Sequence, residues 1–122
     1  MTKRVEEALR NPYVRCLSHP TGRYLNRRRE NALDLERVFE VALEEGVALE
    51  VNGLPDRLDL SGEHVREALE AGVEIVCSTD AHSVRGLANI ELSVATARRG
   101  GAAPADVLNT RSLDEVLARR FG

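Results

Sequence analysis

The sequence is poor in aromatic residues: they make up only 3% of its 122 residues, and none of them is Trp. Hydrophobic residues still account for 43% of the chain, so a core can form, and it must be built from Leu, Val, Ala and Ile. The length suits one domain spanning residues 1–122. No apolar run approaches the ~20 residues that a membrane-spanning helix needs, and no signal sequence opens the chain. We therefore expect a cytoplasmic domain without a membrane partner.

Cysteine and net charge are also scarce. The two cysteines, Cys16 and Cys77, each lie in an apolar segment, which favours reduced core thiols over a disulfide. The chain carries 17 basic and 20 acidic residues, for a net charge of −3. This balance predicts neither a nucleic-acid-binding arm nor a polybasic membrane surface.

Helical and strand-like segments alternate along the chain. Amphipathic periodicity and capping residues predict helices over 3–10, 34–45, 61–71, 87–99 and 112–120. Short apolar runs predict strands over 13–17, 47–52, 73–78 and 106–109. The segment 42–47 (Ala-Leu-Glu-Glu-Gly-Val) recurs as 68–73 (Ala-Leu-Glu-Ala-Gly-Val), so a unit of helix, glycine and strand is repeated. This alternation predicts parallel strands joined by right-handed crossovers.

Four strands are too few to close a barrel, because closure takes about eight. The predicted fold class is therefore α/β, either a partial (β/α) barrel or a small open sheet, with about four parallel strands and flanking helices. Both sheet edges would need covering by a partner chain or by a missing half of the barrel. We therefore expect the isolated chain to self-associate or to be marginally stable.

Polar side chains follow three of the predicted strands. His19 comes after the first strand, Glu50 and Asn52 close the second, and Asp80 and His82 follow the third. The carboxyl ends of parallel strands meet at one edge of a sheet, where sites gather. An imidazole and a carboxylate two residues apart can turn toward one point and suit Zn²⁺ or Mn²⁺. The placement predicts that His19, Asp80 and His82 converge on a divalent ion.

Simpler explanations exist for each of these residues. Asp80 could cap the following helix, and the His19 imidazole could bond only to the backbone of its loop. Glu50 could pair with Arg57. His64 falls among charged residues on a helix, so we expect it to be solvated. The run 27–29 (Arg-Arg-Arg) is usually a solvated loop, with phosphate contact as the minority interpretation.

Several motifs together resemble the C-terminal half of the polymerase and histidinol phosphatase (PHP) domain, most closely that of bacterial family X DNA polymerases. They occur in the order 19–23 (His-Pro-Thr-Gly-Arg), 50–52 (Glu-Val-Asn), 57–60 (Arg-Leu-Asp-Leu), 79–83 (Thr-Asp-Ala-His-Ser), 97–100 (Ala-Arg-Arg-Gly) and 107–110 (Val-Leu-Asn-Thr). The resemblance covers nearly the whole chain. It implies a distorted α/β barrel that binds metal ions at the carboxyl ends of its strands and hydrolyses phosphate esters.

The resemblance also implies roles for individual residues. His19, Asp80 and His82 match metal ligands, for Zn²⁺, Mn²⁺ or Mg²⁺, and Asp80 and His82 are the predicted catalytic residues. We expect Asn52, Arg57 and Arg23 to lie near the substrate. That substrate would be a phosphate ester, or a DNA 3′ end if the chain is part of a polymerase with exonuclease and repair functions.

One departure from the family is large. The histidine motif and bridging Glu of the family's N-terminal half do not occur in this chain, whose only histidines are His19, His64 and His82. Whether the chain is an enzyme by itself therefore stays open. The alternatives are a non-catalytic metal-binding or structural module, and a small-molecule phosphatase of the histidinol-phosphatase type.

Overall fold

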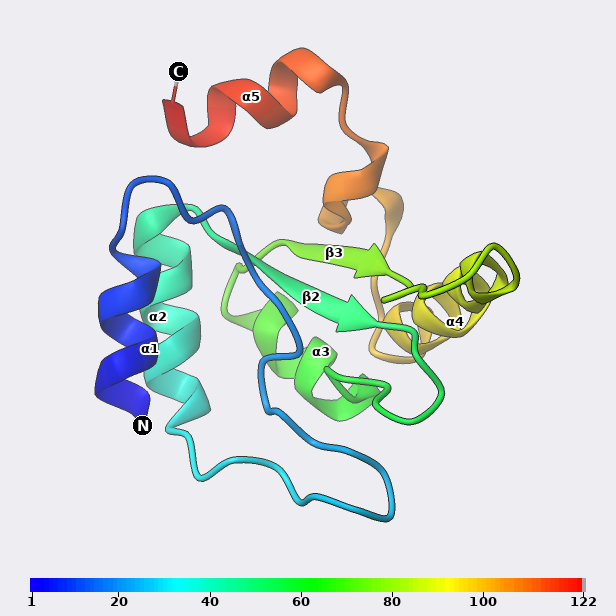
Figure 1. Ribbon diagram of the computed structural model, residues 1–122. Helices are drawn as coiled ribbons and strands as arrows, with labels where there is room; N and C mark the ends of the chain where they lie inside the picture. Colours follow the sequence, from blue (N-terminus) through cyan, green and yellow to red (C-terminus); the bar gives the residue numbers. More distant parts are fainter. Residues whose placement is uncertain (122) are drawn as a thin grey trace.

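The computed structural model describes the backbone of residues 1–121 and the side chains of residues 1–118. Its elements, in chain order, are α1 (Thr2–Leu9), β1 (Cys16–Leu17), α2 (Leu35–Glu45), β2 (Ala48–Asn52), α3 (Gly62–Glu70), β3 (Ile75–Ser78), η1 (Arg85–Asn89), α4 (Ile90–Arg99), η2 (Pro104–Asp106), η3 (Leu108–Thr110) and α5 (Leu113–Phe121). The strands form one parallel sheet in the order β1-β2-β3 (Figure 1). The predicted α/β class and parallel pairing are confirmed.

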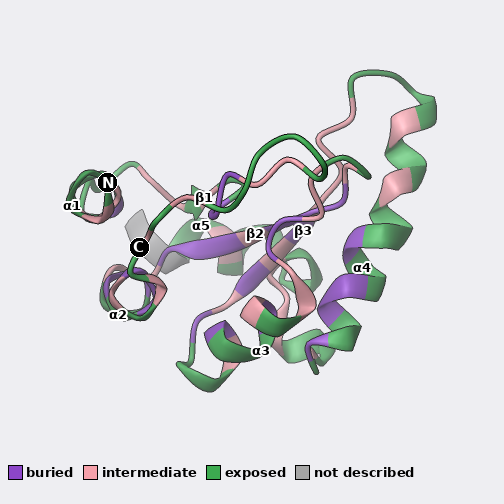
Figure 2. Cartoon of the chain, turned by 90° about the horizontal axis from the view of Figure 1, so that it is seen from below, coloured by how far each residue is buried: buried purple, intermediate pink, exposed green. Residues whose placement is uncertain are grey.

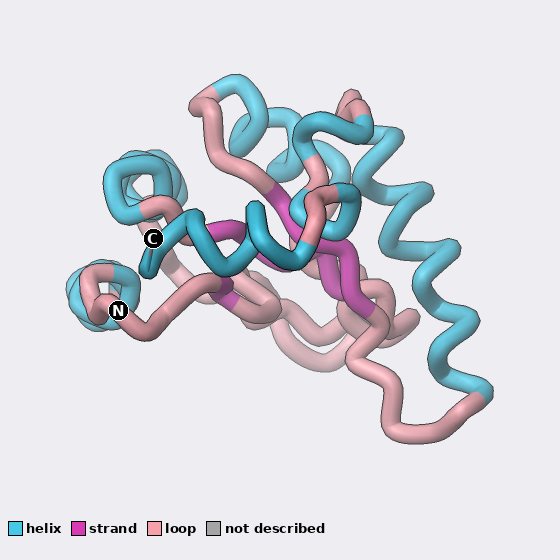
Figure 3. Tube along the Cα trace, turned by 90° about the horizontal axis from the view of Figure 1, so that it is seen from above, coloured by secondary structure: helices cyan, strands magenta, loops and turns pink. Residues whose placement is uncertain are grey.

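Helices α2 and α3 begin where the capping residues indicated, whereas α4 begins at Ile90, three residues later than predicted, because residues 85–89 form η1. The Asp34 side chain accepts a hydrogen bond from the Arg37 amide at 3.2 Å, at the start of α2. The Ser61 hydroxyl accepts one from the His64 amide at 3.2 Å, at the start of α3. These caps satisfy amides that have no partner inside the helix. Figure 3 shows the resulting helices arranged around the three strands.

Three helices end in the same turn. A glycine with positive φ follows each of α2, α3 and α4: Gly46 (66°), Gly72 (88°) and Gly101 (93°). The next amide then donates to a carbonyl in the last turn of the helix, from Val47 to Ala42 (2.9 Å), from Val73 to Ala68 (3.0 Å) and from Ala102 to Ala97 (3.0 Å). This is the Schellman arrangement, in which glycine takes the left-handed position at no steric cost. The repeat seen in the sequence is therefore a repeated turn, and it occurs a third time after α4.

The core is aliphatic, as the composition requires. It joins β2 and β3 to the inner faces of α2, α3 and α4, which Figure 2 shows as buried. Phe39 is the one aromatic side chain among the buried residues that the structure describes. Cys77 belongs to this core, but Cys16 is exposed, so the prediction of a buried thiol is wrong for Cys16; β1 lies at the open edge of the sheet. Both cysteines are free, as expected.

The predicted strand over 106–109 is not a strand. These residues form parts of η2 and η3, and only one parallel bridge, between Ile75 and Val107, joins them to β3. The Asn109 side chain occupies the edge instead: its Oδ1 accepts from the Cys77 amide at 2.8 Å, and its Nδ2 donates to the Cys77 carbonyl at 2.9 Å. The side-chain amide thus makes the hydrogen bonds that the backbone of an adjacent strand would make. The described part of the chain has a sheet of three strands rather than about four, and its membership of a partial PHP-type barrel stays an expectation.

Several exposed apolar side chains lie on η1 and on α4, which follow each other along the chain. Val84 and Leu87, at η1, and Leu92 and Val94, on α4, are all exposed. Beside them, a groove of about 580 Å³ lies between α4 and the segment 102–110. The predicted self-association is compatible with this surface and stays a prediction. Within residues 1–121, no helix is long and apolar enough to cross a membrane.

Candidate functional site at the carboxyl ends of the strands

A hydrogen-bond network centred on the Glu50 carboxylate connects the ends of all three strands. Its Oε1 accepts from the backbone amide of His19 at 2.7 Å and from Asn52 Nδ2 at 3.2 Å. Its Oε2 accepts from the hydroxyl of Ser78, the last residue of β3. Because the strands are parallel, their carboxyl ends lie at one edge of the sheet, and Glu50 is the residue that joins them there.

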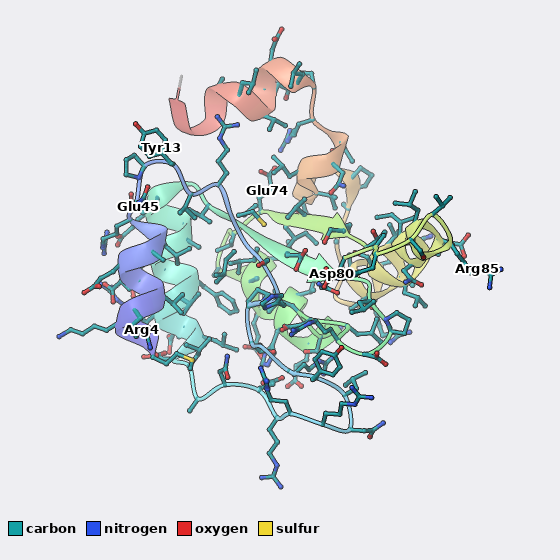
Figure 4. The ribbon with its side chains drawn as sticks, viewed as in Figure 1. Arg4, Tyr13, Glu45, Glu74, Asp80 and Arg85 are labelled. Atoms are coloured by element: carbon teal, nitrogen blue, oxygen red, sulfur yellow. The ribbon has the colours of Figure 1, made fainter. Side chains whose placement is uncertain are left out.

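Asn52 extends this network to Asp80. Its Nδ2 donates to Asp80 Oδ2 at 3.1 Å, and its Oδ1 accepts from the Leu54 amide at 2.9 Å. Only 1% of Asn52 is exposed, so these bonds satisfy polar atoms that water cannot reach. Figure 4 places Asp80 at the tip of β3, close to the end of β2. Glu50 and Asn52 lie two residues apart on β2, and the bond between their side chains shows that both point to the same side of the strand.

Two of the predicted ligands have an unusual backbone. His19 and Asp80 have positive φ angles of 27° and 53°. Residues with a Cβ rarely adopt this conformation, which costs about 1–3 kcal/mol and tends to occur at functional sites. The hydrogen bond that the His19 amide donates to Glu50 and the one that Asn52 donates to the Asp80 side chain hold both residues in place.

The imidazole of His82 is oriented by its own loop. Its Nδ1 lies 2.7 Å from the backbone carbonyl of Asp80, and the side chain is exposed. A bond of this kind fixes the ring and turns Nε2 toward other partners, which is how metal-binding histidines are commonly held. Asp80 thus fixes His82 through its carbonyl while its carboxylate contacts Asn52.

The donors are of the right type for a metal ion, but they are not gathered closely. Two imidazoles and a carboxylate suit Zn²⁺ or Mn²⁺. Within residues 1–118, however, no three His, Cys, Asp or Glu side chains form a group that could hold a metal ion. The assignment of His19, Asp80 and His82 as ligands therefore stays a prediction.

A second carboxylate, that of Asp59, anchors the His-Pro-Thr-Gly-Arg segment. Asp59 is fully buried and accepts hydrogen bonds from the Thr21 hydroxyl at 2.8 Å, the Thr21 amide at 3.1 Å and the Gly22 amide at 2.9 Å. Burial raises the pKa of Asp59, while the bonds from Thr21 and Gly22 act in the opposite direction. The loop that carries His19 is thereby fixed to the loop that follows β2.

Arg23 and Arg57 close the same pair of loops. Arg23 Nε donates to the Arg57 carbonyl at 3.0 Å, and its guanidinium also donates to the Leu58 carbonyl. Arg57 Nη1 lies 3.4 Å from the Arg23 carbonyl, and its guanidinium stacks 4.8 Å from the centre of the Tyr24 ring. The substrate-binding role expected for both arginines stays a prediction, and their contacts within the chain are structural.

The expectation for His64 is wrong. Its side chain is only 17% exposed, with Nε2 3.0 Å from a carboxylate oxygen of Glu30 and Nδ1 3.6 Å from one of Glu67. The segment before α2 brings Glu30 over the helix surface, and neither residue's sequence context indicates this contact. His64 is a structural residue of α3 rather than a solvated one.

Two important residues were missed or misread from the sequence. Glu50 was one of the strand-end candidates, with pairing to Arg57 as the alternative, and the structure instead bonds it to His19, Asn52 and Ser78. Alternation along β2 was the available signal for this arrangement. Asp59 has no comparable signal, because its partners Thr21 and Gly22 lie in a loop far away along the chain.

The chain is similar to the DNA polymerase/3′-5′ exonuclease PolX of Bacillus subtilis (strain 168), with 43% identity over 116 residues, 95% of this chain and 20% of that protein. It is a homologue of the C-terminal part of PolX. This confirms the resemblance to the PHP segment of family X polymerases. The homologous region includes the strand ends described above, because it covers nearly all of the chain.

Proteins described as probable phosphatases are also similar. One from Acetivibrio thermocellus is 33% identical over 86 residues, 66% of this chain and 33% of its own length. One from Thermoanaerobacter sp. (strain X514) is 28% identical over 115 residues, 89% of this chain and 44% of its own length. No family model matches the sequence. The chain therefore spans about a fifth of PolX and less than half of these two phosphatases.

Proposed function

We propose that the chain is the C-terminal part of a metal-dependent phosphoesterase of the PHP type, which in a polymerase would act on the 3′ end of DNA. The observation that supports this most directly is the Glu50 and Asn52 network, which ties the loops bearing His19, Asp80 and His82 to one edge of the sheet. The similarity to PolX and to probable phosphatases agrees with this chemistry.

In this proposal each residue has a defined task. His19, Asp80 and His82 would hold a divalent ion, with Zn²⁺ or Mn²⁺ favoured by the donors and Mg²⁺ less so. Such an ion stabilises the charge that develops on a phosphate ester during hydrolysis. Glu50 and Asn52 hold the two loops at the correct separation. Further ligands would come from the rest of a longer protein, since three donors in this chain are not gathered into a complete site.

Calorimetric titration with Zn²⁺ tests the ligand assignment. The chain should bind weakly, and His82→Ala should remove most of the heat of binding because it deletes an oriented nitrogen donor. His64→Ala is the matched control, since His64 contacts Glu30 and Glu67 away from this network. Equal losses in the two variants, or full binding by His82→Ala, would exclude the proposed ligand set.

Hydrolysis of a nitrophenyl phosphate tests how much of the active site this chain supplies. With an incomplete set of ligands, we expect the rate to stay at background in the presence of Zn²⁺ or Mn²⁺. Clear metal-dependent turnover that is lost in Asp80→Ala would show that these three residues suffice for catalysis. That result would contradict the need for further ligands.

A further inference from the structure

The loop between β1 and α2 carries arginines that no carboxylate neutralises. Elsewhere, Arg10, Arg37 and Arg111 form ion pairs with glutamates at 2.5–3.4 Å. In contrast, Arg27, Arg28 and Arg29 have no ion pair with any described side chain, although the whole chain has a net charge of −3. All three are exposed. The basic loop 27–29 is thus a local excess of positive charge in an acidic protein.

This loop is held in a defined shape. Tyr24 and Arg28 pair as in an antiparallel bridge, with N–O distances of 2.9 and 2.7 Å, and the Leu25 amide donates to the Asp56 carbonyl at 2.6 Å. The Arg27 guanidinium lies 5.6 Å from the centre of the Tyr24 ring. A preorganised turn loses less conformational entropy on binding than a flexible one. The arginines are therefore presented on a fixed support.

The carboxylates nearest in sequence are engaged elsewhere or bonded to the backbone. Glu30, directly after the basic loop, lies 3.0 Å from His64 Nε2. Asp34, the next carboxylate along the chain, accepts from the Arg37 amide at 3.2 Å as the cap of α2. A shallow hollow of about 310 Å³ is lined by Asn26 and the three arginines alone. The surface offers an anion several guanidinium groups and no carboxylate in the lining of the hollow.

We propose that the basic loop 27–29 binds the phosphate backbone of a nucleic-acid strand and directs it along the loop toward the strand ends. Arginine guanidinium groups recognise phosphates through paired hydrogen bonds. His19 lies near the start of the same loop and donates its backbone amide to Glu50, so the basic loop and the Glu50 network share one continuous segment of the chain. The binding itself needs no metal ion; only the fate of the bound strand rests on the proposed phosphoesterase function.

A strand fits these observations better than a single phosphate group. Three consecutive exposed guanidinium groups can contact successive phosphates, whereas one phosphate monoester would use only part of them. Contacts to phosphates carry no base information, so the binding is independent of sequence. Nonspecific binding of this type has dissociation constants of about 10⁻⁴–10⁻⁶ M and weakens steeply with salt. The basic loop would therefore favour a polymeric substrate over a small phosphorylated metabolite.

Fluorescence anisotropy of a labelled oligothymidylate of about 20 nucleotides, longer than most single-strand sites, provides the test. It is performed in EDTA at several salt concentrations, on the chain and on the triple variant Arg27→Gln/Arg28→Gln/Arg29→Gln. The control is Arg4→Gln/Arg66→Gln/Arg85→Gln, which removes the same charge from exposed positions on other elements. Figure 4 shows Arg4 and Arg85 far apart on α1 and beside α4.

We expect the loop triple variant to bind at least ~10-fold more weakly and to lower the salt slope by about 2, since each single-strand phosphate contact contributes about 0.7. The control should lose less than ~2-fold, because long-range effects are screened at physiological salt. The double variant Arg28→Gln/Arg29→Gln, which keeps the Arg27 contact with Tyr24, should show an intermediate loss.

Three results would overturn the inference. Equal losses in the loop and control variants would mean that only net charge matters. Displacement of the oligonucleotide by inorganic phosphate at matched ionic strength would indicate a site for one phosphate group. Tighter binding to phosphatidylserine vesicles than to the oligonucleotide would indicate a membrane surface. None of these depends on Zn²⁺ binding, so a failed metal titration with intact strand binding would count against the proposed function alone.

Discussion

At the two ends of the sheet, the left-handed backbone conformation is adopted by different types of residue. At the end where the strands begin, the positive-φ positions Gly46 and Gly72 are glycines in regular helix-ending turns. In the loops that follow the strands, positive φ is found at His19, Asn26, Leu58 and Asp80, beside a single glycine, Gly22. Glycine avoids a strain of roughly 1–2 kcal/mol that other residues bear. One end is thus built for stability, and the other keeps particular side chains despite the strain.

The largest effect is expected where the strained loops are anchored. Asp59→Asn keeps the shape of the side chain but turns an amide donor toward the donors of Thr21 and Gly22. Leaving buried donors unpaired costs about 1–3 kcal/mol. We expect the free energy of unfolding, measured with urea, to fall by ~2 kcal/mol.

Asp56→Asn is the matched control for that substitution. Asp56 is exposed in the same loop, and surface changes of this kind usually stay within ~0.5 kcal/mol. A loss in Asp59→Asn as small as in the control would mean that the anchor contributes little to the stability of this end.

Substitutions at one positive-φ position from each end should change the stability in different directions, and both changes should be smaller than that of Asp59→Asn. Gly72→Ala meets only ordinary contacts with Leu43, so its cost is the backbone strain at φ 88°, about 1 kcal/mol. Asp80→Gly relieves strain at φ 53° and loses one bond to Asn52, so we expect its stability to be unchanged or slightly raised. Melting curves of both variants are the measurement. Equal destabilisation by the two substitutions would remove the distinction between the ends.

The smallest effect concerns pH. Burial raises the pKa of Asp59, so the folded chain retains a proton that the unfolded chain releases near pH 4. The stabilisation linked to this proton is complete below the unfolded-state pKa and is lost as pH rises through the folded-state pKa. The stability lost in Asp59→Asn should therefore be larger near pH 4 than near pH 7. The difference between the two pH values should be smaller than the stability changes expected for Asp59→Asn and for Gly72→Ala. A loss that is constant, or that grows with pH, would contradict the direction of the shift.

The sequence was informative where local pattern determines structure. Amphipathic periodicity, Asp34 and Ser61 as caps, and glycine after each helix are local signals, and they located α2, α3, β2 and β3 to within a few residues. The contacts of Glu50, Asp59 and His64 could not be derived in this way. Each joins segments brought together only by the fold, so their partners are set by tertiary packing. The same reason explains residues 106–109, where a side chain of Asn109 replaces the strand that propensity favoured.

The Asn109 side-chain amide covers the outer edge of β3 at Cys77 through hydrogen bonds that another strand could replace. It offers Cys77 one acceptor and one donor, the same pair that the backbone of an adjoining strand would offer. An incoming strand can replace both of these bonds, so the number of hydrogen bonds at Cys77 would stay the same. Addition of a strand at this edge therefore requires its backbone to displace the Asn109 side chain from Cys77. The outcome depends on the effective concentration of the incoming strand.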